Sequence, residues 1–352
     1  MSGSWQVRAQ YQLRWLWQIT FWDAGNGVGS DEPRRLRIRV EVPDRPGWSD
    51  RADKYLTENL ELVNRSQLQK RCRCLRINGS EARASRRVRH GDIIEVDLDP
   101  EPPSAISAED VGLSVVFEND DVVVVDKPPG MVVHPGAGNW SGTLAHGLLY
   151  HVSALDADPD SLRPGIVHRL DKDTSGVMIC ARHLGAKEFL SRQFAARRVG
   201  KRYVAVTRGV PRPVRGTVSG TLARDPAHRR RFRHQTKGGR TALTDYRVAR
   251  VYGGRYALVM LRPRTGRTHQ LRVHMTHLGT PILGDSLYGR RDGRFPDARL
   301  CLHALALTVM LPGELVPRTF TAPIPSDMRA IMVELLAEQA DSQDSKRALR
   351  PR

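Results

Sequence analysis

The segment Gly165–Gly176 reads GIVHRLDKDTSG and lies directly before the apolar run Val177–Ala181. It places three side chains suited to catalysis, those of His168, Arg169 and Asp171, in a loop bounded by glycines. A polar loop beside an apolar strand is a common place for catalytic residues, because loops carry function on a rigid scaffold. A structural turn, in which Asp and Ser side chains accept hydrogen bonds from the backbone, explains the same residues. Both interpretations stay open on this segment alone.

The loop also matches the opening of an EF-hand calcium loop, through Asp171, Asp173, Ser175 and Gly176. The twelfth position of such a loop must be Glu, and here it is Arg182. We therefore expect no calcium site in this segment.

A second segment, Arg262–Asp285, reads RPRTGRTHQLRVHMTHLGTPILGD. His274 and His277 are spaced as two metal ligands on one helical face, and His269 precedes them. However, the segment has no H-E-x-x-H pattern and no Cys, and its histidines are flanked by arginines: Arg262, Arg264, Arg267, Arg272 and Arg290. Such a cationic environment repels metal and attracts phosphate. We interpret the segment as facing RNA, with one Arg neutralising a buried carboxylate.

In a third segment, GKRYVAV (Gly200–Val206), Tyr203 follows Lys201 and Arg202. An aromatic ring among cations suits stacking on an unpaired base, although a Tyr at the start of a strand is as often part of the core. The glycine-rich stretch GNGVGS (Gly25–Ser30) lacks the G-K-[ST] ending of a phosphate-binding loop. We therefore expect no cofactor, so an enzyme of this sequence would use side chains alone.

These three segments belong to a larger domain that we predict over residues 113–337. Apolar runs predict strands at 113–117, 122–125, 177–181, 202–208, 244–250, 256–262 and 305–310, the first two as a hairpin of buried strands. Helical spacing predicts helices at 143–151, 186–196, 269–278 and 326–337. Because strands dominate without regular βαβ alternation, the predicted fold class is α+β with a mixed or antiparallel sheet.

A smaller basic domain is predicted over residues 36–97. Local patterns predict helices near 52–60 and from Asn64, and strands at 75–77 and 93–96, with a turn at Asn78-Gly79. The stretch NRSQLQKRCRCLRINGSEARASRRVRHGDIIEV (64–96) resembles the S4 RNA-binding domain. This resemblance implies RNA contacts from four basic residues: Arg65, Lys70, Arg71 and Arg73.

Three segments are expected to lie outside these domains. Residues 1–35 show no firm periodic pattern and are expected to form a poorly ordered extension. Residues 98–112 contain prolines and acidic residues, as a linker does. Residues 338–352 are polar and basic and are expected to be disordered.

Composition supports a nucleic-acid partner. The 352 residues contain 56 Lys and Arg against 38 Asp and Glu, a net charge of +18, which favours binding to a polyanion. The cysteines Cys72, Cys74, Cys180 and Cys301 form no C-x-x-C pair and suit reduced thiols. With no apolar segment long enough to span a membrane and no signal-peptide pattern, the expected location is the cytoplasm.

The combination of motifs resembles the RluA family of pseudouridine synthases. The segment RPGIVHRLDKDTSGVMICAR is similar to the family's signature around its catalytic Asp. Four further blocks agree in order: VVDKPPGMVVHPG (124–136), KRYVAVTRG (201–209), RDPAHRRRF (224–232) and TGRTHQLRVHMTHLGTPILGDSLYG (265–289). The resemblance spans about residues 113–335 and implies an α+β catalytic domain that isomerises uridine without a cofactor.

The resemblance also implies residue roles. Asp171 would act as nucleophile at C1′ or as base at C2′, and the sequence leaves both routes open. Arg169 would fill the gap left by the flipped uridine. Tyr203 would stack on the base and take part in proton transfer, Arg272 would pair with Asp171, and Leu271 would pack on the other face of the base. His168 and Arg267 are expected to contact the substrate.

The expected substrate is large-subunit ribosomal RNA, from the family resemblance together with the S4-like module. Two alternatives stay open: a transfer-RNA synthase of the same chemistry, and a non-catalytic RNA-binding protein of ribosome assembly. The presence of Asp171 and Arg272 argues against the second. A monomer is the default expectation.

Overall fold

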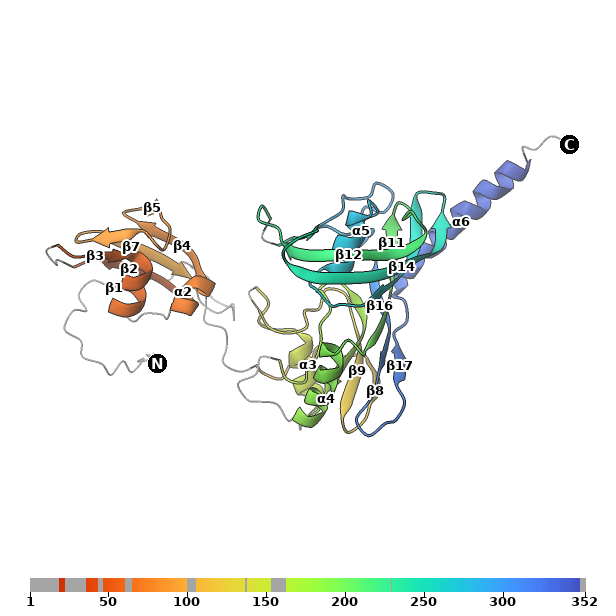
Figure 1. Ribbon diagram of the computed structural model, residues 1–352, viewed down its shortest axis with the longest axis horizontal. Coiled ribbons are helices and arrows are strands. Elements are labelled where there is room, and N and C mark those ends of the chain that lie inside the picture. Colours follow the sequence, from red (N-terminus) through yellow and green to blue (C-terminus); the bar gives the residue numbers. More distant parts are fainter. Residues whose placement is uncertain are drawn as a thin grey trace, which may run out of the picture. The chain divides into compact units, whose positions relative to one another are not determined.

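The computed structural model describes residues 19–22, 36–43, 47–60, 65–99, 106–136, 138–152, 163–228 and 230–348. The chain divides into two compact units, Met1–Pro102 and Pro103–Arg352, drawn in Figure 1. The division falls inside residues 98–112, where the sequence predicts a linker. Each unit is described by itself.

The N-terminal unit is a curved antiparallel sheet with short helices. The strands follow the order β1 (Ile19–Trp22), β2 (Leu36–Glu41), β7 (Ile93–Leu98), β4 (Cys72–Ile77) and β5 (Ser80–Glu81). A second small sheet pairs β3 (Ser49–Arg51) with β6 (Arg87–Arg89), and the helices are α1 (Ala52–Lys54), the π-helical η2 (Tyr55–Asn59) and α2 (Arg65–Arg71). On β7, alternate residues are buried, and Leu56 and Leu68 pack in the same core.

Several local predictions for this unit are confirmed. The predicted helices and strands are present, and Asn78 and Gly79 both have positive φ, as a two-residue hairpin turn requires. The expectation for residues 1–35 is wrong in one part, because Ile19–Trp22 forms β1 and pairs with β2. The rest of that segment, and the predicted cap Asn64, lie outside the described residues.

The larger unit is built on one sheet in the order β13–β12–β14–β15–β11–β16–β10–β9–β8, with β17 paired to β16. The strands are β8 (Val115–Glu118), β9 (Val122–Lys127), β10 (Ser175–Ala181), β11 (Gly200–Arg208), β12 (Arg215–Arg224), β13 (Phe232–Gln235), β14 (Arg240–Tyr252), β15 (Tyr256–Pro263), β16 (Leu302–Val309) and β17 (Arg318–Thr321). Among the described strands only β10 and β16 pair in parallel. This mixed sheet confirms the predicted α+β class.

Two helices cover opposite faces of the sheet at β9 and β10. Successive side chains of a strand point to opposite faces. Val124 of β9 therefore packs in one core with Leu190 of α4 (Leu184–Ala195), whereas Val123 packs in another with Leu148 of α3 (Leu144–His151). This sandwich fixes β10, and with it the end of the loop that precedes it.

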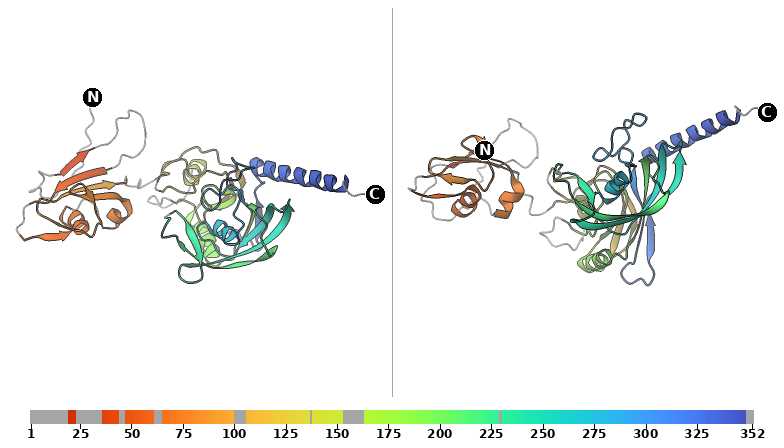
Figure 2. Two further views of the ribbon diagram at one scale, coloured as in Figure 1. Left: turned by 90° about the horizontal axis from the view of Figure 1, so that it is seen from above. Right: turned by 45° about the horizontal axis from the view of Figure 1, so that its top comes forward.

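The other end of the sheet supports α5 (Gln270–His277) and α6 (Ser326–Ala348). Leu271 and Met275 of α5 share a core with Met328 of α6 and with residues of β11, β14 and β15. The long strands β12 and β14 curve past α5 (Figure 2), and Val273 packs against Leu222 of β12.

Three features of this unit differ from the sequence prediction. Strand β8 is largely exposed and not buried, because it is the edge of the sheet. Strands β12, β13 and β17 were not predicted, since their residues lack a clear apolar alternation. Helix α6 continues to Ala348 through the segment expected to be disordered, and Glu338 forms ion pairs with Arg255 and Arg294. Residues 349–352 lie outside the described residues.

Among the helices of the described ranges, none is both long enough and apolar enough to cross a bilayer.

Candidate active site

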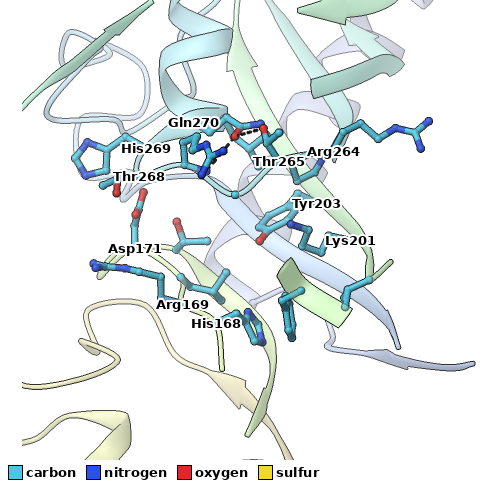
Figure 3. Close-up of a pocket in the computed structure, with 18 of the residues that line it drawn as sticks. His168, Arg169, Asp171, Lys201, Tyr203, Arg264, Thr265, Thr268, His269 and Gln270 are labelled. Atoms are coloured by element: carbon cyan, nitrogen blue, oxygen red, sulfur yellow. Dashed lines mark hydrogen bonds between the residues drawn. The ribbon is translucent and has the colours of Figure 1, made fainter. Parts of the chain in front are cut away.

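A cavity of about 410 Å³ in the larger unit brings the three polar sequence segments together. Its walls come from the loop before β10, the start of β11 and the segment that leads into α5. Asp171, Tyr203, Leu271 and Arg272 all line it. Figure 3 shows the first two of these side chains. In Figure 3 the hydroxyl of Tyr203 points towards the side of the cavity where Asp171 lies.

Two glycines hold the ends of the Asp171 loop against the sheet. Gly165 has φ +65° and a Cβ there would lie 2.4 Å from the carbonyl oxygen of Ala181. Gly176 has φ +118° and a Cβ would lie 2.3 Å from the carbonyl oxygen of Ala304. Both backbones approach a neighbouring strand closer than any side chain permits, so glycine is required at both ends.

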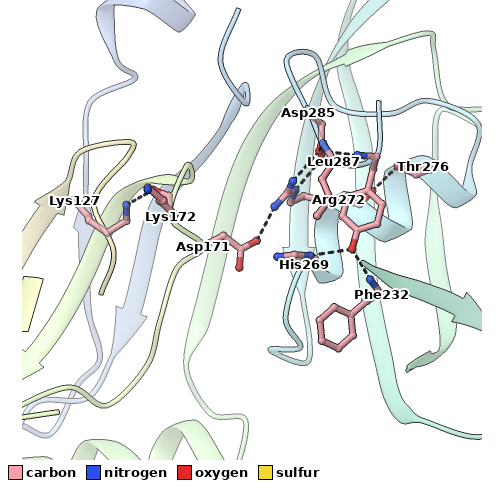
Figure 4. A network of polar contacts seen from close by, with 10 residues as sticks. Lys127, Asp171, Lys172, Phe232, His269, Arg272, Thr276, Asp285 and Leu287 are labelled. Atoms are coloured by element: carbon pink, nitrogen blue, oxygen red, sulfur yellow. Dashed lines mark hydrogen bonds and ion pairs between the residues drawn. The ribbon is translucent and has the colours of Figure 1, made fainter. Parts of the chain in front are cut away.

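The loop is also tied down by a buried lysine. Lys127, at the end of β9, is fully buried, and its Nζ donates to the carbonyl oxygens of Pro128, Met131 and Lys172 at 2.7–3.0 Å (Figure 4). Burial lowers the pKa of Lys127 to about 8. Because Lys172 directly follows Asp171, this contact fixes the backbone next to the carboxylate. Lys127 lies in the motif VVDKPPGMVVHPG, from which no role was predicted for it.

Asp171 forms the expected ion pair with Arg272, but at the long end of the range. The distance from Arg272 Nη1 to Asp171 Oδ2 is 3.7 Å. The closer partner of Arg272 is Asp285, whose carboxylate accepts from Nε and Nη2, both at 2.8 Å (Figure 4). Asp285 Oδ1 also accepts from the backbone amides of Leu287 and Tyr288. Asp285 was not predicted as part of the site.

The charges of this triad are mutually stabilised. Burial alone would lower the pKa of Arg272 and raise the pKa of Asp285, but their bidentate contact outweighs both effects. The pKa of Arg272 is therefore raised and that of Asp285 is lowered. The result is a fixed, buried cation that faces the carboxylate of Asp171.

Tyr203 and Leu271 supply the apolar part of the cavity. Tyr203 extends from β11, and burial, with a further effect of the Asp171 charge, raises the pKa of its hydroxyl above the ordinary value. Leu271, in the first turn of α5, is buried. A carboxylate, a fixed cation, an aromatic ring and an aliphatic side chain therefore line one cavity, an arrangement that suits the enclosure of a planar base.

The known proteins that this chain resembles in sequence or structure are named as pseudouridine or pseudouridylate synthases. A sequence family described as RNA pseudouridylate synthase matches residues 121–277. The "Ribosomal large subunit pseudouridine synthase D" of Borreliella burgdorferi is 39% identical over 267 residues, which are 74% of this chain and 82% of the relative. The Xanthomonas campestris protein of that name is 37% identical over 325 residues, covering 88% of this chain and 96% of the relative. The solved structure of Human RNA Pseudouridylate Synthase Domain Containing 4 is 28% identical, with a TM-score of 0.49 over 63% of this chain and 92% of that one.

The chain belongs to the RNA pseudouridylate synthase family. Relatives above one third identity, each matched over most of its length, establish this membership and confirm the resemblance inferred from the motifs. The protein is therefore a pseudouridine synthase, an isomerase that acts on RNA.

In this synthase a histidine not assigned by the sequence analysis also faces the cavity. His269, considered there only as a metal ligand, has the left-handed φ of 56° directly before α5. Its Nδ1 forms a hydrogen bond of 2.9 Å with the hydroxyl of Tyr288, which also accepts from the amide of Phe232. Burial lowers the pKa of His269. The Arg272 guanidinium lies over the ring of Tyr288, 5.2 Å from its centroid.

Two of the residues predicted to contact substrate, Arg169 and Arg267, line the cavity but have different surroundings. Arg169 is exposed at the cavity rim beside Asp171 (Figure 3). Arg267 donates through Nε to the carbonyl oxygen of Thr241, so it also anchors its own loop.

His168 lines the cavity wall, but its ring serves the structure. Its Nε2 accepts from the amide of Ile179, and its ring stacks on Phe194 at 4.5 Å. Burial lowers the pKa of His168 to about 3, so the ring is neutral at pH 7. These contacts favour a supporting role over direct substrate contact.

The four basic residues expected to bind RNA belong to the N-terminal unit. Arg65 lies 3.8 Å from Asp53, Lys70 is exposed, and Arg73 lies 3.7 Å from Asp99. Arg71 donates to the backbone carbonyl of Asp99 and so fixes the end of β7. Their role in RNA binding stays a prediction.

Proposed function

We propose that this synthase converts uridines of large-subunit ribosomal RNA to pseudouridine, with Asp171 as its catalytic carboxylate. The observation that carries the proposal is the position of Asp171, 3.7 Å from a buried Arg272 whose guanidinium is held by Asp285. The RNA class follows the names of the relatives in Borreliella burgdorferi and Xanthomonas campestris, "Ribosomal large subunit pseudouridine synthase D".

The reaction breaks the N1–C1′ bond, turns the uracil in the cavity and forms a C5–C1′ bond. The hydrogen on C5 leaves as a proton, and N1 takes up a proton, so that the product is an isomer of the substrate. One ionised carboxylate starts either route, by attack on C1′ or by removal of the C2′ proton. Arg272 supplies a fixed positive charge 3.7 Å from the Asp171 carboxylate.

The other site residues hold the base. Tyr203 stacks on the flipped uracil and takes part in proton transfer at C5, while Leu271 packs on the opposite face. Arg169, exposed at the rim, occupies the space that the uridine leaves in its stack. His168 and Arg267 support the loops that carry these groups, through their bonds to Ile179 and Thr241.

The proposal extends to the whole chain. The N-terminal unit binds structured RNA through Arg65 and Lys70, in the manner of an S4-like domain, and Arg71 and Arg73 add positive charge. A cytoplasmic location and a monomeric state complete the proposal. Transfer RNA is the alternative substrate of the same chemistry.

The test is pseudouridine mapping by carbodiimide-stop sequencing on total RNA from cells that lack the gene. These cells are complemented with the wild-type protein or with Asp171→Asn. We expect specific stops in large-subunit ribosomal RNA to vanish on deletion and to return only with wild type. If the stops are lost from transfer RNA instead, transfer RNA is the substrate and the ribosomal assignment is wrong. Full rescue by Asp171→Asn would refute the role of Asp171.

A further inference from the structure

A second and larger cavity, of about 1010 Å³, lies in the same unit and has no role in the mechanism above. It is formed by the second half of α4, the start of β11 and the end of β16. Lys201 lines both cavities, so the second cavity meets the active site at this residue.

The second cavity is lined by cations without compensating acids. Its basic residues are Arg192, Arg198, Lys201, Arg202 and Arg262, and no Asp or Glu lines it. The four arginines are exposed, and within the part of the chain that the structure describes none of their guanidinium groups forms an ion pair. Other arginines of this unit are neutralised, such as Arg299 by Asp327.

The walls of the second cavity are fixed by the fold. Gln193 of α4 donates to the carbonyl of Met310 and accepts from its amide, which clamps the helix to the end of β16. Successive side chains of β11 point to opposite faces of the sheet. Arg202 therefore lines only the second cavity and its neighbour Tyr203 only the active site.

We propose that this second cavity binds phosphodiester groups of the RNA strand beside the flipped uridine. The inference rests on the proposed function, because an RNA strand that places one nucleotide in the active site must continue past its edge. Guanidinium groups bind phosphate through two parallel hydrogen bonds and stay charged at all physiological pH values. A cavity of this size exceeds the space of a single phosphate. The shared Lys201 is the point where the strand passes from one cavity to the other.

The experiment compares two double variants with the same loss of charge. Arg198→Gln/Arg262→Gln removes two cations of the second cavity. Arg215→Gln/Arg247→Gln is the matched control, because these exposed arginines face each other on β12 and β14 and line neither cavity. Kinetics are measured on an unmodified large-subunit ribosomal RNA transcript at several salt concentrations.

For the cavity variant we expect KM to rise about tenfold with kcat nearly unchanged, and the salt dependence of kcat/KM to weaken by about 1.4 to 2 units of slope, since two cations are removed. The control should stay close to wild type. Arg198→Lys/Arg262→Lys, which keeps both charges, should recover most of the salt slope.

Equal losses in the cavity variant and the control would overturn the proposal, because net charge alone would then explain them. A fall in kcat without a change in KM would also overturn it. To separate this inference from the proposed function, binding of a single-stranded RNA 12-mer is measured by fluorescence anisotropy. If wild type makes no pseudouridine in the transcript, the proposed function fails, whereas weaker 12-mer binding by the cavity variant alone still supports the second cavity.

Discussion

Arg272 forms ion pairs with two carboxylates, a close one with Asp285 and a longer one with Asp171. Asp285 holds its guanidinium in a bidentate contact at 2.8 Å, and Asp171 lies at 3.7 Å from the nitrogen that Asp285 does not use. The guanidinium is therefore held by Asp285 and faces Asp171 without a close contact to it. The carboxylate of Asp171 therefore stays open to substrate.

Loss of Asp285 should disturb both stability and activity. Asp285→Asn leaves the buried Arg272 charge with one distant partner, so we expect the free energy of unfolding to fall by about 3 kcal/mol. Urea denaturation measures this change. Asp297→Asn is the control, because that carboxylate is 93% exposed in its ion pair with Arg291, and it should change stability by less than about 0.5 kcal/mol. Similar stabilities for both variants would contradict the buried triad.

The neutral ring of His168 predicts an acid-dependent loss of stability. Its folded-state pKa of about 3 lies below the ordinary value near 6.5. As the pH falls, His168 therefore binds a proton in the unfolded chain before it does so in the folded one. The contribution of the neutral ring to the free energy of unfolding is complete above about pH 6.5 and is lost progressively towards pH 3. Wild type should lose up to about 1.4 kcal/mol per pH unit more than His168→Gln over this window. Parallel pH profiles, or a large rise in KM for the variant, would argue against the supporting role.

At the scale of single residues, some members of the active site can be predicted from the sequence and others cannot. Asp171, Tyr203 and Arg272 lie in short motifs whose local chemistry stands out. Asp285 and Lys127 contribute through partners 13 and 45 residues away along the chain, Arg272 and Lys172, and no local pattern reports such contacts.

At the scale of elements, the site depends on how the loop before β10 joins the sheet. Gly176 pairs with Ala304 in the one parallel strand pair among the described strands. Ser175 Oγ donates to Nδ1 of His303, whose Nε2 donates to the carbonyl of Ala322. These contacts connect the Asp171 loop to β16, which lies between β10 and β11, the strand that carries Tyr203.

Gly176→Ala should therefore break this junction. The new Cβ would meet a backbone oxygen at 2.3 Å in a left-handed conformation, and we expect a loss of about 3 kcal/mol or more together with lost activity. Gly254→Ala is the control, since its φ is +71° but no atom lies within 4 Å. Its loss should be about 1–2 kcal/mol, from strain alone. Thermal unfolding compares the two, and an equal loss would show that close packing at Gly176 is unimportant.

Strands with continuous apolar runs, such as β9 and β10, are readable from the sequence because burial on both faces leaves an unambiguous pattern. Strand β12 is not, since only Val218 and Leu222 of its side chains are buried. Helix α6 extends beyond its prediction, and the ion pairs of Glu338 with Arg255 and Arg294, which composition does not report, hold the start of its polar continuation.

At the scale of the whole molecule, two units share a net charge of +18. Electrostatic attraction of this size favours RNA of any sequence, whereas the proposed mechanism requires one flipped nucleotide in the active site. Overall charge and the two-unit division are accessible from composition and linker signals. The second basic cavity was not, because α4, β11, β15 and β16 contribute its residues from distant parts of the chain.

The N-terminal unit should contribute to binding and not to chemistry. Arg65→Gln/Lys70→Gln removes two charges far along the chain from the active-site motifs, so we expect KM for the long transcript to rise with kcat unchanged. Arg65→Lys/Lys70→Arg, which keeps the charges, serves as the control. A fall in kcat alone would contradict a binding role.

The most direct test of the central claim is tritium release from RNA labelled at C5 of uridine, since isomerisation expels the C5 hydrogen. Wild type, Asp171→Asn and Asp173→Asn are compared, the last as an exposed carboxylate of the same loop. The account predicts release by wild type and Asp173→Asn, and none above background by Asp171→Asn, which still binds the RNA. Release by Asp171→Asn at the wild-type rate would contradict it.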